Sequence, residues 1–244
     1  NPLQDLYNPN PYRPWATADN GIVSRNRIEV ASRALYLIDT IRLNDQWRIQ
    51  GGLRWDNYDV ELRNVATATG ALTARESSSS FVNWHLGVAY LPRPDVTLYA
   101  NIASSSNPSG EQLDSTGLDY GGLDARIVDL DPERNIAWEL GVKTSMFNDN
   151  VSLTAAIFEI NKTDARTVVG SGPTAIVTLD GEQRVRGLEV LVAGNITREW
   201  SVFGGITLMD TEVVESGQPS QVGQPFPNVS EVSFTMTSRY EITD

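Results

Sequence analysis

The sequence of 244 residues predicts an all-β protein, an antiparallel up-and-down transmembrane β-barrel of which the chain supplies an incomplete part. Three observations predict it. Apolar residues recur at every second position, the period of a strand with one apolar and one polar face. The arms of the clearest predicted hairpin are about a dozen residues long or more, about twice the ordinary strand length in soluble proteins. Short and long connectors alternate along the chain, as in outer-membrane barrels.

Residues 134–166 show the alternation most clearly and predict a β-hairpin. Ile136, Trp138 and Leu140 fall on one face of its first arm, between polar residues. Asparagine and aspartate within residues 147–150 favour a tight turn, because they tolerate left-handed backbone. At about 3.3 Å per residue and a tilt near 40°, a dozen residues climb roughly 30 Å, the thickness of a bilayer's hydrocarbon core.

The same period predicts nine strands. Short turns near Asn44, Pro92, Asp149 and Arg198 alternate with longer connectors. Because outer-membrane barrels have short periplasmic turns and long extracellular loops, these four turns define the periplasmic end. The predicted strands are residues 27–43, 46–58, 81–91, 96–102, 134–146, 151–166, 184–196, 200–213 and 232–240, and the predicted long loops are 59–80, 104–133, 167–183 and 215–228.

The first strand is the least regular of the nine. Its even positions are mostly apolar, which predicts that they form its apolar face. Leu35, Leu37 and Ile41 interrupt that pattern at odd positions, so a β-bulge or a register slip is expected there. The even apolar positions are Ile28, Val30, Ala34, Tyr36 and Ile38.

Trp47 and Trp55 lie on one face of the second strand, at a spacing of about 20 Å once tilt is included. Indole rings favour membrane interfaces, so the spacing fits two aromatic girdles around a lipid band. Both residues fit a soluble β-sandwich core equally well. The glycine pairs 51–52 and 204–205 lie inside strands, where glycine permits tight curvature or close side-chain packing.

The composition argues against an enzyme and against nucleic acid as a partner. The chain has no cysteine and one histidine, His85, which leaves no nucleophile pair and no zinc site with nitrogen or sulfur ligands. A net charge of -12 is unsuited to neutralising phosphates. His85, Glu139 and Lys143 fall on polar faces and are expected to line the lumen, because a lysine at the bilayer midplane costs about 2 to 4 kcal/mol.

The predicted loop 104–133 is strongly acidic. A divalent-cation site, a bridge to the anionic outer leaflet, and a loop kept soluble by its charge are the alternatives, and the last is favoured. The acidic residues are Glu111, Asp114, Asp119, Asp124, Asp129, Asp131 and Glu133, against Arg126 alone.

Nine crossings would leave the two termini on opposite sides of the membrane, whereas bacterial single-chain barrels have even strand numbers. Residues 1–244 are therefore expected to form one partial barrel domain of a larger protein.

Several motifs resemble the barrel of TonB-dependent siderophore receptors. The mid-barrel signature of that family resembles residues 130–143 (LDPERNIAWELGVK), 153–158 (LTAAIF) and 161–166 (NKTDAR). Its continuation resembles residues 181–189 (GEQRVRGLE) and 225–229 (PFPNV). The catecholate branch is similar in residues 104–109 (SSSNPS).

The resemblance implies a barrel of about 22 strands in the bacterial outer membrane, plugged by an N-terminal domain, that imports ferric siderophores with energy delivered through TonB. It implies that this chain is a mid-barrel segment without the plug, which is the part that meets TonB, and without the remaining strands. Its partners would be the ferric siderophore and outer-membrane lipid, with no covalently bound cofactor. A passive porin and a soluble or surface β-sandwich used for binding are the alternative hypotheses.

A ferric catecholate is anionic and aromatic. Arginine pairs with anionic oxygens and stacks on planar rings, so arginine and aromatic residues are the candidates for contacting it. The candidates are Arg13, Trp15, Tyr120, Arg126, Arg166 and Arg184.

Overall fold

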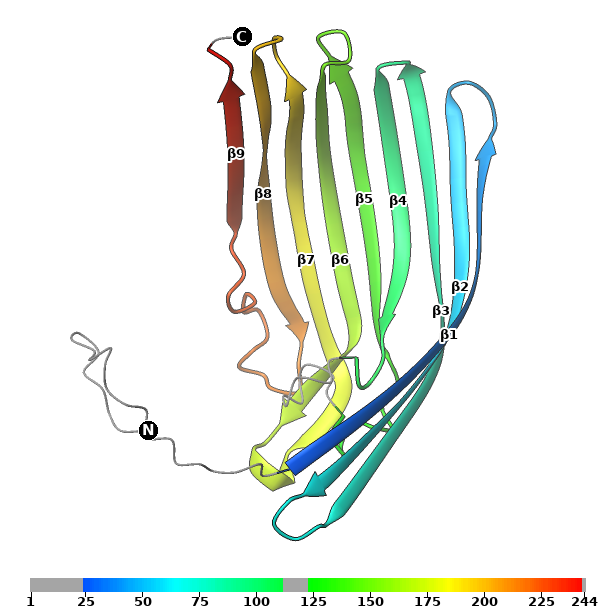
Figure 1. Cartoon of the computed structure of the whole chain (residues 1–244), viewed down its shortest axis with the longest axis vertical. Coiled ribbons are helices and arrows are strands. Elements are labelled where there is room, and N and C mark those ends of the chain that lie inside the picture. Colours follow the sequence, from blue (N-terminus) through cyan, green and yellow to red (C-terminus); the bar gives the residue numbers. More distant parts are fainter. Residues whose placement is uncertain (1–23, 112–122, 243–244) are drawn as a thin grey trace, which may run out of the picture.

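The computed structural model describes residues 24–111 and 123–242, which form one nine-stranded antiparallel sheet. Each strand pairs with its neighbours in sequence, and Figure 1 shows the strands side by side as a curved wall with the short turns at the top. The nine predicted strands are confirmed. They are β1 (Ser24–Arg42), β2 (Trp47–Ala66), β3 (Leu72–Arg93), β4 (Val96–Asn107), β5 (Glu133–Met146), β6 (Val151–Val169), β7 (Ile176–Asn195), β8 (Trp200–Glu215) and β9 (Val232–Tyr240), with the short 3-10 helix η2 (Gly172–Thr174) between β6 and β7.

In the part of the chain that the structure describes, no helix combines the length and the apolar character needed to cross a membrane.

The cross-strand register assigns the two faces of the wall. Leu53 stands opposite Trp84, and Ile102 stands opposite Trp138, so these residues share one face, which we call the outer face. Large apolar side chains remain exposed along that face in the middle of the wall, where a bilayer would cover them. They include Leu37, Leu53, Leu86, Leu140, Ile157, Leu188 and Leu208.

Aromatic residues flank this apolar band at both ends. At the end with the short turns, the rings of Trp47 and Tyr90 stack with centroids 4.6 Å apart. At the other end Trp55, Trp84 and Trp138 are 44%, 36% and 39% exposed. Exposed indoles on one face fit membrane girdles and contradict the alternative of a sandwich core, whose aromatics would be buried.

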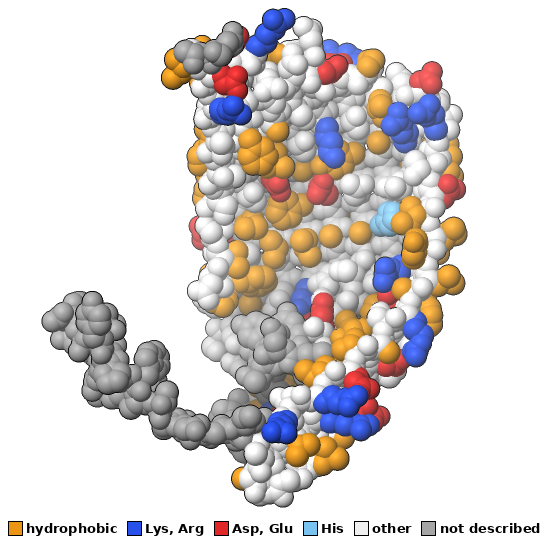
Figure 2. Space-filling view, viewed as in Figure 1, with side chains coloured by type: hydrophobic (Ala, Val, Ile, Leu, Met, Phe, Trp, Pro, Cys, Tyr) orange, Lys and Arg blue, Asp and Glu red, His pale blue; other side chains and the backbone are white. Residues whose placement is uncertain are grey.

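The inner face is the hollow side of the wall, and Figure 2 looks into that hollow, where charged and apolar side chains are intermixed. His85, Glu139 and Lys143 lie on this inner face, as predicted. Their register partners Gly52, Phe158 and Thr154 lie on the inner face too, because successive side chains of a strand alternate between the two faces. Lys143 Nζ lies 5.1 Å from the centre of the Tyr99 ring.

Inner-face glycines lie under the side chains of their direct cross-strand partners. A Cβ on Gly52 would come within 2.4 Å of His85 Cε1, and one on Gly141 within 2.5 Å of the Tyr99 ring. These close approaches confirm close side-chain packing, one of the two roles predicted for the glycine pairs, at Gly52 and Gly205. The full set of such pairs is Gly52 with His85, Gly87 with Asn101, Gly141 with Tyr99, Gly187 with Phe158 and Gly205 with Leu191.

The face predicted for the first strand is wrong. The β1–β2 register runs without a shift, and it places Leu35 opposite Trp55 and Leu37 opposite Leu53. The odd positions therefore form the lipid-facing side, and no bulge or slip is present in β1. The apolar residues at even positions predict the wrong face because this strand also carries apolar side chains on its inner face.

Two of the predicted long loops are also wrong. Residues 59–80 and 167–183 are mostly strand, since β2 and β3 pair as far as Val65 opposite Leu72, and β6 and β7 pair as far as Val169 opposite Ile176. These arms extend beyond the apolar band. Water can contact both of their faces, so no apolar period is required of them. The long connectors 108–132 and 216–231 agree with the other two predictions.

Candidate functional site

The described part of the long loop between β4 and β5 carries two buried apolar residues. Ile127 is fully buried, and Leu123 and Val60 of β2 are 6% and 3% exposed. A Cβ on Gly110 would lie 2.7 Å from Val60 and 3.4 Å from Leu123, so the chain passes close over the extended arm of β2. The described part of the loop is therefore folded onto the wall.

Hydrogen bonds from the β2–β3 arm hold the loop in this position. Tyr58 donates from its hydroxyl to the Gly110 carbonyl oxygen at 3.1 Å. Ser77 Oγ donates to the Val128 carbonyl oxygen at 2.8 Å, and Arg75 donates to the Leu123 carbonyl oxygen at 3.2 Å. Burial, with a smaller effect of the Glu111 charge, raises the pKa of Tyr58, so its hydroxyl stays a donor at neutral pH.

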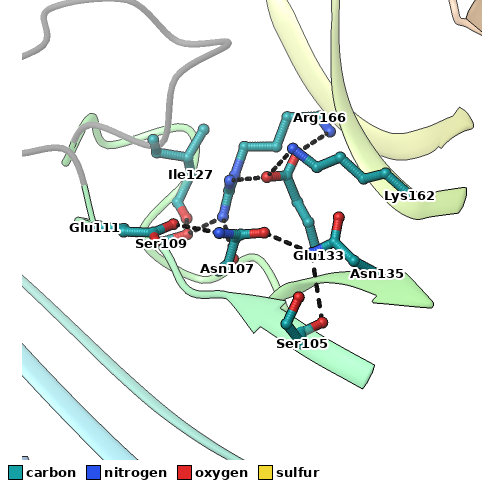
Figure 3. Close-up of polar contacts among 9 residues, drawn as sticks. All are labelled: Ser105, Asn107, Ser109, Glu111, Ile127, Glu133, Asn135, Lys162 and Arg166. Atoms are coloured by element: carbon teal, nitrogen blue, oxygen red, sulfur yellow. Dashed lines mark hydrogen bonds and ion pairs between the residues drawn. The ribbon is translucent and has the colours of Figure 1, made fainter. Parts of the chain in front are cut away.

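A buried ionic cluster lies where the loop joins β5, and Figure 3 shows its side chains pointing toward one another. We call it the loop-anchoring cluster. Its members are Asn107, Ser109, Glu133, Lys162 and Arg166.

Glu133 is the centre of the cluster. Its Oε2 lies 2.9 Å from Arg166 Nη1 and 2.8 Å from Lys162 Nζ, and its Oε1 accepts the Arg166 backbone N–H at 2.8 Å. The side chains of Glu133 and Arg166 are only 5% and 1% exposed. Two cations share one carboxylate here, so the loss of Glu133 would leave both without their main counter-charge.

Arg166 also binds the other end of the loop. Its Nη2 donates to the Asn107 carbonyl oxygen and to Ser109 Oγ, both at 3.3 Å, and Ser109 Oγ donates to the Ile127 carbonyl oxygen at 2.7 Å. Its Nε has no partner in the described part of the chain. One guanidinium from β6 thus joins Asn107 and Glu133, the two residues that flank the loop.

Arg126 makes a second link, nearer the surface. Its Nε donates to Asp124 Oδ1 at 2.8 Å and its Nη1 donates to the Gly172 carbonyl oxygen at 3.2 Å, which ties the loop to η2. Hydrogen bonds from Arg126, partly opposed by burial, lower the pKa of Asp124 to about 2. Both side chains are about one-third exposed, so the Arg126 guanidinium is still reachable from solvent.

The structure does not bring the described candidate arginines together at one site. Arg126 lies on the loop surface, whereas Arg166 is buried inside the loop-anchoring cluster. Arg184 shares the outer face with Leu188 and pairs with Glu212. The other candidates, Arg13, Trp15 and Tyr120, lie outside the described residues.

The acidic loop shows no cation site within its described residues. No group of three or more His, Asp or Glu side chains there could hold a metal ion. Glu133 pairs with Arg166 and Lys162, Asp124 pairs with Arg126, and Glu111 accepts a hydrogen bond from Asn107. Asp114 and Asp119 lie outside the described residues.

The sequence alone does not indicate the loop-anchoring cluster, because the residues that form it are distant from one another along the chain. Glu133 and Arg166 are 33 positions apart, and each belongs to a motif without any spacing that indicates a pair. The one signal is that both flank the hairpin arms at the same height, with Arg134 opposite Thr163 in the register.

Comparison with known proteins agrees with this architecture. The family model described as "TonB dependent receptor-like, beta-barrel" matches residues 2–244. The chain belongs to this family. Its members are outer-membrane receptors and transporters of bacteria rather than enzymes, which also contradicts the soluble-sandwich alternative.

Individual receptors match nearly the whole chain. A probable TonB-dependent siderophore receptor of Acinetobacter baumannii, PiuA, is 27% identical over 93% of this chain and 33% of its own length. A probable TonB-dependent receptor of Bordetella pertussis, BfrD, is 32% identical over 91% of this chain and 30% of its own length. The chain therefore spans about a third of the length of these relatives.

Solved receptor structures share the fold. The crystal structure of PiuA superimposes with a TM-score of 0.79 and 29% identity over 89% of this chain and 32% of that one. The closed form of the ferric-catecholate import receptor Fiu from Escherichia coli K12 gives a TM-score of 0.76 and 26% identity over 90% and 33% of the two chains. The described part of the chain is thus a run of nine adjacent strands of a receptor barrel.

Proposed function

We propose that this chain forms part of the wall and outer loops of a receptor that imports ferric siderophores of the catecholate class, energised through TonB. The observation that carries the proposal is the match to PiuA and Fiu over nine-tenths of the chain at more than 25% identity. Fiu is named a catecholate siderophore receptor, and PiuA a siderophore receptor.

The architecture of the loop supports a receptor in preference to a passive pore. The loop between β4 and β5 packs on the extended β2–β3 arm and is held by the loop-anchoring cluster. A preorganised loop at the extracellular end presents a defined surface to a ligand and loses little conformational entropy when it binds one.

Within this loop Arg126 is the described candidate best placed to contact an anionic ligand. Its guanidinium is held by Asp124 and Gly172 but remains partly exposed. Arg166 acts differently, by fixing the loop, and Arg184 faces outward. Arg13, Trp15 and Tyr120 stay candidates of the same kind, and each is tested by substitution.

The decisive experiment is uptake of ⁵⁵Fe by a strain whose only siderophore receptor is the full-length protein, supplied with one catecholate, one hydroxamate or one carboxylate siderophore. We expect uptake of the ferric catecholate, and its loss when TonB is deleted. Uptake that survives TonB deletion, together with steady ion conductance in planar bilayers, would instead establish the porin alternative.

Substitution of the partly exposed Arg126 tests its role in ligand binding. Arg126→Gln should raise the half-saturation concentration for the ferric catecholate by about tenfold, the effect of losing one charge-assisted contact. Arg184→Gln is the matched control, since Arg184 lies on the outer face and should leave uptake unchanged. Equal effects of the two substitutions would remove Arg126 from the binding surface.

A further inference from the structure

The wall contains a seam between β3 and β4. Their backbone ladder runs from the short turn to His85 opposite Ala103 and stops there. Beyond that point, farther from the short turns, β3 continues paired only with β2, and β4 continues paired with β5 as far as Asn107 opposite Glu133. Figure 1 shows the β1–β3 arms turning away from β4 below this level. The seam lies inside the sheet, between its third and fourth strands, and not at an edge.

Side chains close the end of the seam that lies nearest the short turns. Ser104 Oγ accepts the Trp84 backbone N–H at 2.9 Å, which replaces a missing ladder hydrogen bond. Two residues farther along β4, Ser106 Oγ donates to Asn83 Oδ1 at 3.0 Å across the gap. These contacts show that the divergence of β3 and β4 is built into the sequence and is satisfied by polar groups.

A cleft of about 650 Å³ lies over this seam. Most of its lining belongs to the outer face, including Trp55, Trp84 and Ile136, and the end of the loop, Asp131 and Pro132, lines it as well. Because Trp55 and Trp84 are girdle residues, the cleft opens at the extracellular membrane–water interface. The outer-face part of its lining is reached from the outer leaflet.

The lining combines three kinds of group. Indole rings and Ile136 offer apolar surface, while serines and asparagines offer hydroxyl and amide groups on both sides of the seam. Arg134 adds a guanidinium whose side chain is 74% exposed, with Asp164 at 3.8 Å. Aromatic faces with hydroxyl and amide partners suit a saccharide, and an exposed arginine at its edge suits a phosphate.

We propose that this cleft binds the phosphorylated saccharide headgroup of a glycolipid in the outer leaflet. Arg134 pairs with the phosphate, the serine and asparagine side chains hydrogen-bond the sugar, and the acyl chains lie down the apolar band beside Trp84 and Ile136. The indole rings and the Ile136 side chain of this site face lipid.

The test uses the full-length receptor in detergent, titrated with purified lipid A, a bisphosphorylated glucosamine disaccharide lipid, and read by native mass spectrometry. We expect saturable binding that Arg134→Gln weakens by about tenfold or more, the effect of one charge-assisted contact. Thr163→Trp should block the cleft, because Thr163 is an exposed residue on its rim. The matched control is Arg93→Gln, an equally exposed arginine (68%) at the opposite end of the wall.

Three results would overturn the proposal. They are the absence of saturable binding to the wild-type receptor, equal binding by the Arg134→Gln and Arg93→Gln variants, and equally tight binding of phosphatidylglycerol, which carries a phosphate without a saccharide. Heat-modified mobility on a gel confirms that each variant is a folded barrel, so a loss of binding is attributable to the cleft.

Discussion

Replacing Glu133 by glutamine tests the loop-anchoring cluster most directly. The substitution keeps the size of the side chain and the Oε1 acceptor for the Arg166 backbone N–H, but it removes the charge shared by Arg166 Nη1 and Lys162 Nζ. Removing one partner of a buried ion pair costs about 3 to 5 kcal/mol, because the remaining charge is left uncompensated. The barrel wall does not depend on this contact, so we expect local opening of the loop rather than global unfolding.

The measurement is hydrogen exchange of the full-length receptor, at the loop amides of Ile127 and Leu130, which donate to the Asp124 and Ile127 carbonyl oxygens at 3.1 Å. A loss of about 3 to 5 kcal/mol accelerates exchange through local opening by roughly 10²-fold to several 10³-fold. The same amides report whether the described part of the loop remains folded on β2.

Glu29→Gln provides the control, since it makes the identical chemical change in the exposed pair Arg27–Glu29, whose side chains are 76% and 58% exposed. Such surface pairs contribute about 0 to 1 kcal/mol, so exchange near Glu29 should change by less than about tenfold. If Glu133→Gln accelerates loop exchange no more than Glu29→Gln changes its own surroundings, the cluster does not anchor the loop.

Three further predictions follow from single contacts. The folded pKa of Asp124 is about 2, below its ordinary 3.8, so its ionised form stabilises the loop fully above the ordinary pKa, and this stabilisation is lost as the pH falls through about 2. Protease cleavage of the loop should therefore rise as the pH falls through this window, and the Asp124→Asn variant should show no such rise. Leu37→Lys should destabilise the barrel in urea titrations by about 2 to 4 kcal/mol, whereas Ile38→Lys on the inner face should cost less, and the reverse order would refute the corrected face of β1. Gly187→Ala should cost about 1 to 3 kcal/mol in the same assay, since its Cβ would lie 2.4 Å from the Leu208 carbonyl oxygen, and a neutral result would contradict that close approach.

The sequence predicts the strands best where lipid constrains them. Along β5, lipid on one side and the hollow on the other impose the period of two, so Trp138 and Lys143 were assigned to their correct faces. Beyond the apolar band this constraint ends, and the arms are held by polar pairs such as Asp59 with Ser78 and Arg33. Such pairs have no apolar period, which is why residues 59–80 resemble a loop.

The first strand shows a different limit. Tyr36 and Leu37 are adjacent and both apolar, so the pattern alone does not distinguish the lipid face from the inner face. Pairing with β2 resolves it, because Tyr36 stands opposite Arg54 and Leu37 opposite Leu53. Similarly, Arg166 was identified from its residue type, but its burial against Glu133 depends on the register of β5 and β6.

The seam and the anchored loop are two sides of one divergence in the wall. Where β3 leaves β4, the loop core of Leu123 and Ile127 packs on the inner side against the β2–β3 arm, and the cleft opens on the outer side. Asp131 and Pro132 line the cleft just before Glu133 enters the loop-anchoring cluster. Glu133→Gln should therefore weaken glycolipid binding at the cleft as well as loosen the loop, whereas Arg134→Gln should weaken binding and leave the loop amides protected. This difference in loop protection would show that the loop-anchoring cluster supports the cleft structurally, whereas Arg134 contacts the glycolipid itself.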